Sequence, residues 1–139
     1  MVPWMSEKEI EIIDEFLRPE WAVFEWGCGG STLRWRNRVK EWISIDHNPE
    51  WAGKIPNVVL RSDPLNYTLY PLTLGRHFDL VLVDGILRGD CLLVASFVAD
   101  QALEHDSIRT KASEYWPRAE TLVEGEVKGN HRGLRRYWK

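Results

Sequence analysis

The chain has 139 residues, of which 44% are hydrophobic and 28% charged, and its formal net charge is −3. These values predict one soluble globular domain spanning residues 1–139, and they argue against polyanion binding over the whole surface. Two cysteines, Cys28 and Cys91, give neither a disulfide framework nor a zinc-binding spacing, so we expect reduced thiols and a cytoplasmic protein. No apolar run approaches the roughly 20 residues of a membrane span, and the N-terminus lacks signal-peptide features.

The first half of the chain alternates helix-forming and strand-forming patterns. A capping box, Ser6 with Glu9, precedes apolar residues at helical spacing and predicts a helix at about 6–18. A short apolar run at 21–26 predicts a buried strand that leads into glycines. The other elements expected here are a helix over 31–38, a strand over 41–46, a short helix from 48 and a strand over 58–61.

The second half begins less regularly. Residues 64–77 contain two prolines and are expected to be irregular or weakly helical. Residues 78–85 give the clearest strand, because their apolar run is typical of strands buried on both faces. Propensity would continue a helix through 98–106, but the topology requires a fifth strand there, which we predict. The remaining expected elements are helices over 89–97 and 107–116 and strands over 120–128 and 133–139.

The order of these elements predicts the fold class. Alternating strands and helices indicate an α/β protein with a doubly wound, Rossmann-like, mainly parallel sheet. Two final strands without an intervening helix indicate a C-terminal antiparallel hairpin at or near one edge.

A glycine-rich turn joins the first predicted strand to the next helix. Gly27, Gly29 and Gly30 allow the backbone to approach a ligand closely, at the edge of the sheet where ligands of such folds bind. Taken alone, this loop indicates only a nucleotide-like ligand, because several folds use one.

Acidic residues stand at the ends of three successive predicted strands. Glu25 lies two residues before Gly27, Asp46 ends the second strand and Asp63 follows the third. A carboxylate in the place of Asp46 can accept hydrogen bonds from both hydroxyls of a ribose. An acid in the place of Asp63 could accept from an adenine amino group, so Asp46 and Asp63 favour an adenosine-containing ligand, and Glu25 with the terminal hairpin favours S-adenosylmethionine.

Together these segments resemble class I S-adenosylmethionine-dependent methyltransferases, at their minimal size. The resemblance extends to a small bacterial and viral branch with an Asp-Gly-x-x-Arg segment, here Asp84 to Arg88, and a later His-Asp pair, here His105-Asp106. The segments that carry it are Glu25-Trp26-Gly27-Cys28-Gly29-Gly30-Ser31-Thr32, Ser44-Ile45-Asp46-His47-Asn48-Pro49-Glu50-Trp51 and Phe78-Asp79-Leu80-Val81-Leu82-Val83-Asp84-Gly85, with Cys91, Arg109 and Tyr115.

The resemblance implies a site for S-adenosyl-L-methionine. The loop Gly27, Cys28, Gly29 and Gly30 would pass under the methionine part of the cofactor. The other implied contacts are Glu25 and Ser31 to its amino and carboxylate groups, Asp46 to the ribose, His47 and Trp51 near the adenine, Asp63 near the adenine amino group, and Asp84 at the active-site mouth. From the residues alone, Trp26 and Trp51 fit better as packing residues.

The catalytic candidates are Asp84, His105 and Asp106, any of which could remove a proton from an oxygen nucleophile. Asp106 could equally cap the following helix. Arg88 could orient an anionic or sugar substrate, or pair with a neighbouring acid. Asp84 and Asp106 also stand where catechol O-methyltransferase-like enzymes hold Mg²⁺, but the later acid-amide pair is missing, so we predict no metal.

The sequence thus favours a methyltransferase acting on the oxygen of a small molecule or sugar-like acceptor, with a homodimer possible and no membrane contact. A nicotinamide-dependent oxidoreductase is the alternative, although Thr32 replaces the third glycine of its fingerprint. A non-catalytic cofactor-binding subunit is a third reading. The basic, aromatic C-terminus could bind nucleic acid, but fits better as a charged edge strand.

Overall fold

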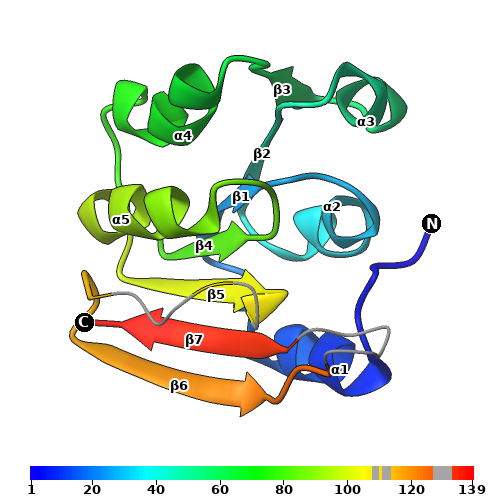
Figure 1. Cartoon of the computed structure of the whole chain (residues 1–139). Helices are drawn as coiled ribbons and strands as arrows, with labels where there is room; N and C mark the ends of the chain where they lie inside the picture. The colour runs from blue at the N-terminus through cyan, green and yellow to red at the C-terminus, as the bar shows by residue number, and fades with distance from the viewer. Residues whose placement is uncertain (108–109, 111–113, 127–132) are drawn as a thin grey trace.

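The computed structural model describes residues 1–107, 110, 114–126 and 133–139. At its centre lies a seven-stranded sheet in the order β3-β2-β1-β4-β5-β7-β6 (Figure 1). The strands are β1 (Ala22–Trp26), β2 (Glu41–Asp46), β3 (Val58–Leu60), β4 (Leu80–Val83), β5 (Gln101–His105), β6 (Arg118–Val123) and β7 (Leu134–Trp138). The helices are α1 (Glu7–Phe16), α2 (Gly30–Trp35), the 3₁₀ turn η1 (Arg36–Arg38), α3 (Pro49–Lys54), α4 (Pro64–Thr73) and α5 (Arg88–Val98).

The sheet confirms the predicted fold class. Strands β1 to β5 are mutually parallel, whereas β7 runs antiparallel to both β5 and β6. The ambiguous stretch at 98–106 does contain the fifth strand, β5. Its alternating side chains are buried on both faces, and it pairs with β4 on one side and β7 on the other. Tertiary pairing therefore overrides the local helical propensity of this segment.

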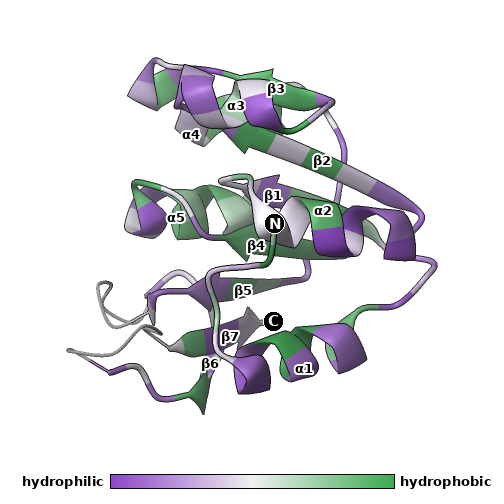
Figure 2. Ribbon diagram, turned by 90° about the vertical axis from the view of Figure 1, so that its right-hand side faces the viewer, coloured by the Kyte–Doolittle hydropathy of each residue, from purple (hydrophilic) through white to green (hydrophobic). Residues whose placement is uncertain are grey.

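Helices cover both faces of the sheet, which explains the continuous apolar run of the central strand. Along β4, Val81 and Val83 pack with α5 residues such as Leu92, while Leu80 and Leu82 pack with Ile13 of α1 on the other face. Figure 2 shows hydrophobic residues along β4 and α5. A strand buried on both sides has no solvent-facing positions, so its sequence does not alternate.

Residues 64–77 are more regular than expected, because Pro64–Thr73 forms the ten-residue helix α4. Pro64 occupies the first turn, where a missing N–H costs little, and Asp63 caps the helix by accepting from the Asn66 N–H. Pro71 lies inside the helix and cannot donate to the carbonyl of Tyr67. That carbonyl instead accepts from the Trp26 indole N–H at 3.0 Å. A core tryptophan thus satisfies the group that the proline leaves open.

Element ends differ from the sequence-based ranges by a few residues. The strand expected at 120–128 is β6, Arg118–Val123, and the helix expected over 31–38 tightens into a 3₁₀ turn after Trp35. The helix expected over 107–116 includes 108–109 and 111–113, and the turn before the last strand includes 127–132; both fall on positions outside the described residues. In the described part of the chain, no helix has the length and apolar character to cross a bilayer.

Candidate functional site

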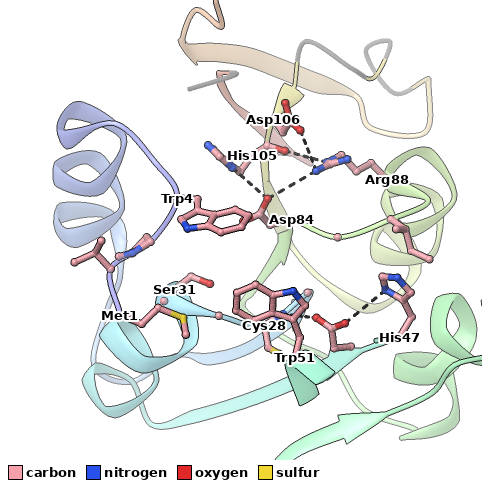
Figure 3. A pocket seen from close by; sticks show the side chains of 18 residues that line it. Met1, Trp4, Cys28, Ser31, His47, Trp51, Asp84, Arg88, His105 and Asp106 are labelled. Atoms are coloured by element: carbon pink, nitrogen blue, oxygen red, sulfur yellow. Dashed lines mark hydrogen bonds and ion pairs between the residues drawn. The ribbon is translucent and has the colours of Figure 1, made fainter. Parts of the chain in front are cut away.

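The carboxyl ends of β1, β2, β4 and β5 surround a cavity of about 560 Å³ (Figure 3). Its size suits a small organic ligand, and its place is the usual one for ligands of open α/β sheets. The lining residues are Met1, Val2, Pro3, Trp4, Gly27, Cys28, Gly29, Gly30, Ser31, Asp46, His47, Trp51, Asp84, Gly85, Ile86, Arg88, His105 and Asp106. The cavity therefore brings together most of the residues expected from the sequence, but not Glu25 or Asp63.

The glycine loop is shaped by two close backbone approaches. Gly27 has φ +88°, and a Cβ there would lie 2.5 Å from the carbonyl oxygen of Asp84. A Cβ on Gly30 would collide with the carbonyl of Val2. The loop is thus packed between the end of β4 and the N-terminal segment, with room for glycine only.

Glu25 lies beneath this loop rather than in the cavity. Its buried carboxylate accepts hydrogen bonds from the hydroxyls of Ser31 and Thr32, each at 2.5 Å, and of Ser44 at 2.7 Å. Burial raises the pKa of Glu25 to about 7, although the three hydroxyls act in the opposite direction. The geometry makes Glu25 a support that ties the start of α2 to β1 and β2.

Asp46 is the buried acid that faces the cavity. Its Oδ2 accepts from the Cys28 N–H and its Oδ1 from the Asn48 N–H, both at 2.9 Å. Each carboxylate oxygen keeps a second lone pair, so Asp46 can still accept two hydrogen bonds from a ligand. His47 lies beside it, with Nδ1 3.5 Å from Asp46 Oδ1. Burial and the nearby Asp46 raise the pKa of the Cys28 thiol to about 12, which keeps it neutral.

Two aromatic rings meet at the cavity. Trp51 of α3 has a ring atom 4.0 Å from the position of a Cβ on Gly29, and its indole meets that of Trp4 edge to face at a centroid distance of 5.7 Å. Trp26 is fully buried in the core, as expected, whereas Trp51 lines the cavity. Asp63 stands outside the cavity and caps α4. Its contact with adenine stays a prediction.

A chain of charged groups lies at the β4 and β5 ends. His105 Nδ1 is 3.1 Å from Asp84 Oδ1, and His105 Nε2 is 3.1 Å from Glu9 Oε2 of α1. Burial disfavours the charged imidazole, but the two carboxylates outweigh it and raise the pKa of His105 to about 9. The same contact with His105 lowers the pKa of Glu9, against the effect of its burial. At neutral pH His105 is therefore an imidazolium and holds no free lone pair for a proton.

Arg88 joins both acids of the pair that could have held a metal. Its Nη2 lies 3.3 Å from Asp106 Oδ2 and 3.9 Å from Asp84 Oδ1, and its Nε donates to the His105 carbonyl at 3.1 Å. The Arg88 guanidinium lies between these two carboxylates, where a divalent cation would have to bind, so the arrangement does not fit a metal there. Among the described residues, no three His, Cys, Asp or Glu side chains gather in a way that could hold a metal ion.

Sequence reasoning missed two contributors to the site, Glu9 and Trp4. Glu9 was recognised only as part of the capping box, which it does form with Ser6. Its second partner, His105, is 96 positions away in the sequence, and no local pattern carries that information. Trp4 belongs to a segment without periodicity, so an unexplained tryptophan near the start of the chain was its only signal.

Comparisons with known proteins agree at the level of the fold. No family model and no curated protein matches this chain. The crystal structure of Thermoplasma acidophilum 1320 has a TM-score of 0.54 at 12% identity, over 94% of this chain and 80% of that chain. The crystal structure of the N-terminal domain of EvdMO1 with SAH bound has a TM-score of 0.53 at 19% identity, over 97% and 67%. The chain thus shares its fold with an SAH-bound domain. Identities this low show the fold alone.

Proposed function

We propose that this protein is an S-adenosylmethionine-dependent methyltransferase that methylates the oxygen of a small acceptor. The observation that carries the proposal is Asp46, a buried carboxylate with two spare acceptor positions beside a glycine loop. These positions suit the two ribose hydroxyls of an adenosine. The loop from Gly27 to Ser31 would take the methionine end, and His47 and Trp51 would flank the adenine. Glu25 would act through the loop that it holds.

The sheet topology favours this cofactor over a nicotinamide dinucleotide. Dinucleotide-binding sheets of this type have the order 3-2-1-4-5-6. Here the antiparallel β7 stands between β5 and β6. In addition, Thr32 stands where the fingerprint requires a third glycine. Its hydroxyl donates a hydrogen bond to Glu25. The SAH-bound structural neighbour supports the same choice.

The acceptor would bind at the opposite end of the cavity, against Asp84 and Arg88. The cofactor, when bound, supplies an activated methyl group on a sulfonium. The protein has to align the acceptor oxygen and take its proton. Of the predicted general bases Asp84, His105 and Asp106, we assign the role to Asp84, because the raised pKa of His105 favours its charged form; His105 would orient Asp84. Arg88 would stabilise negative charge as it develops on the acceptor oxygen.

Titration calorimetry with S-adenosylhomocysteine tests the cofactor assignment. We expect saturable one-to-one binding to the wild type and no comparable binding of NAD⁺. Asp46→Asn should weaken binding about 10- to 100-fold, because it removes charge-assisted hydrogen bonds to the ribose. The matched control is Asp100→Asn, which changes an exposed acid paired with His77 outside the cavity. Tighter binding of NAD⁺, or equal affinities for the two variants, would refute the assignment.

A further inference from the structure

We infer that the acceptor subsite lies between the Trp4 indole and the Asp84–Arg88 pair, and that it takes an aromatic ring bearing an acidic hydroxyl, that is, a phenol. This inference rests on the proposed function and adds the class of the acceptor. It depends on three features of the cavity: an exposed aromatic face, a pair of cations around one carboxylate, and the lack of a strong base among the lining residues.

Trp4 provides the aromatic face. Its side chain is 79% exposed although it lines the cavity, and it is the most exposed tryptophan in the described chain. An exposed aromatic ring that lines a concave site offers a ligand a large apolar contact surface. Figure 3 draws the Trp4 indole together with Asp84 and His105 at the cavity, with Trp51 on the side of Cys28. We therefore place the acceptor on the side of Trp4 and the cofactor on the side of Trp51.

The chain on both sides of Trp4 is held by contacts with the fold. The Val2–Pro3 backbone lies against Gly30 of the glycine loop, and the Ser6–Glu9 capping box starts α1 directly after this segment. Glu9 in turn contacts the His105 imidazolium. The same segment thus places an aromatic ring and supports the charged group that orients Asp84.

Two cationic groups lie at the acceptor side, balanced by the carboxylates of Asp84, Asp106 and Glu9. The imidazolium of His105 and the guanidinium of Arg88 both approach Asp84 Oδ1, at 3.1 and 3.9 Å. A carboxylate such as that of Asp84 is a weak base, and the Arg88 guanidinium beside it could also donate a hydrogen bond to a phenolate oxygen. An aliphatic or sugar hydroxyl loses its proton far less readily and needs a stronger base.

The methyl-transfer step conserves atoms and charge with only the acceptor, the cofactor and Asp84. The acceptor O–H gives its proton to the Asp84 carboxylate, and an oxygen lone pair forms the new bond to the methyl carbon. The electron pair of the broken sulfur–carbon bond returns to sulfur, which loses its positive charge. The products are a methyl aryl ether, the neutral thioether and a protonated Asp84, so charge is conserved without a metal or a redox partner.

The test compares 2-naphthol with decahydro-2-naphthol, which has the same skeleton and hydroxyl but neither aromatic ring nor acidic proton. Both are titrated calorimetrically into the full chain saturated with S-adenosylhomocysteine, and product formation with S-adenosylmethionine is followed by mass spectrometry. We expect 2-naphthol to bind at least tenfold more tightly and to yield 2-methoxynaphthalene, while the saturated alcohol yields no ether.

Variants separate the roles of the ring and the charge. Trp4→Leu should weaken 2-naphthol about three- to tenfold and leave S-adenosylhomocysteine binding unchanged. Phe97→Leu, which changes a 71% exposed aromatic residue of α5 that does not line the cavity, should alter neither. Arg88→Leu should reduce the preference for 2-naphthol over the alcohol.

The other outcomes distinguish a failure of the acceptor inference from a failure of the proposed function. If S-adenosylhomocysteine binds but both alcohols bind equally, or Trp4→Leu has no effect on 2-naphthol, the acceptor inference is wrong and the cofactor assignment stands. If Trp4→Leu weakens S-adenosylhomocysteine instead, Trp4 is part of the cofactor side and the inference is also wrong. If S-adenosylhomocysteine does not bind at all, it is the proposed function that fails.

Discussion

The His105 ion-pair chain makes the stability of the fold depend on pH in a defined direction. The pKa of His105 is raised to about 9 in the folded protein, from its ordinary value of 6.5. A raised pKa contributes its full stability below pH 6.5, where the unfolded chain is also protonated, and loses it as the pH rises through about 9. At about 1.4 kcal/mol for each pH unit between the two values, the contribution is roughly 3 kcal/mol.

Urea denaturation of the wild type and His105→Gln at pH 6, 7.5 and 9.5 measures this term. The difference in unfolding free energy between the two proteins should be largest at pH 6 and shrink by roughly 3 kcal/mol toward pH 9.5. His77→Gln is the matched control, since His77 pairs with Asp100 at the surface at 2.8 Å, where solvent screens the interaction. A difference that stays constant with pH, or an NMR titration of the His105 ring near 6.5, would refute the argument.

Three further predictions follow from the same contacts. Glu9→Gln should lower the pKa of His105, seen in the NMR titration of its ring, and reduce turnover more than it changes the KM for S-adenosylmethionine; an unchanged titration would contradict the ion pair. Gly30→Ala should lower the melting temperature, because its Cβ would collide with the N-terminal backbone, whereas Gly53→Ala in α3, with no neighbour within 4 Å, should not. Cys28 should react slowly with iodoacetamide at pH 7.5, since its pKa is about 12, and rapid alkylation would argue against a neutral thiol.

The fold was predictable because its main signals are local. The apolar run of β4, the capping box at Ser6 and the turn at Gly27 each specify an element from a few neighbouring residues. Helix α4 was expected only as an irregular or weakly helical segment, because the carbonyl that Pro71 leaves open finds its donor in Trp26, which lies far away in the sequence.

The candidate site likewise has a part that the sequence predicts and a part that it does not. Asp46 and Asp84 follow from strand ends and Arg88 from the family resemblance, and all three line the cavity. The protonation of His105 could not be predicted, since it depends on Glu9 from a helix that packs against β5 only in the folded chain. Residue types at strand ends thus predict where a site lies, while the charge states within it depend on long-range packing.

A crystal structure of the chain with S-adenosylhomocysteine tests the central claim most directly. The account predicts the ribose hydroxyls on Asp46, the homocysteine end over Gly27 to Ser31, and the sulfur facing the side of the cavity that holds Asp84 and Trp4. A complex with the ligand outside this cavity, or with its ribose away from Asp46, would contradict it.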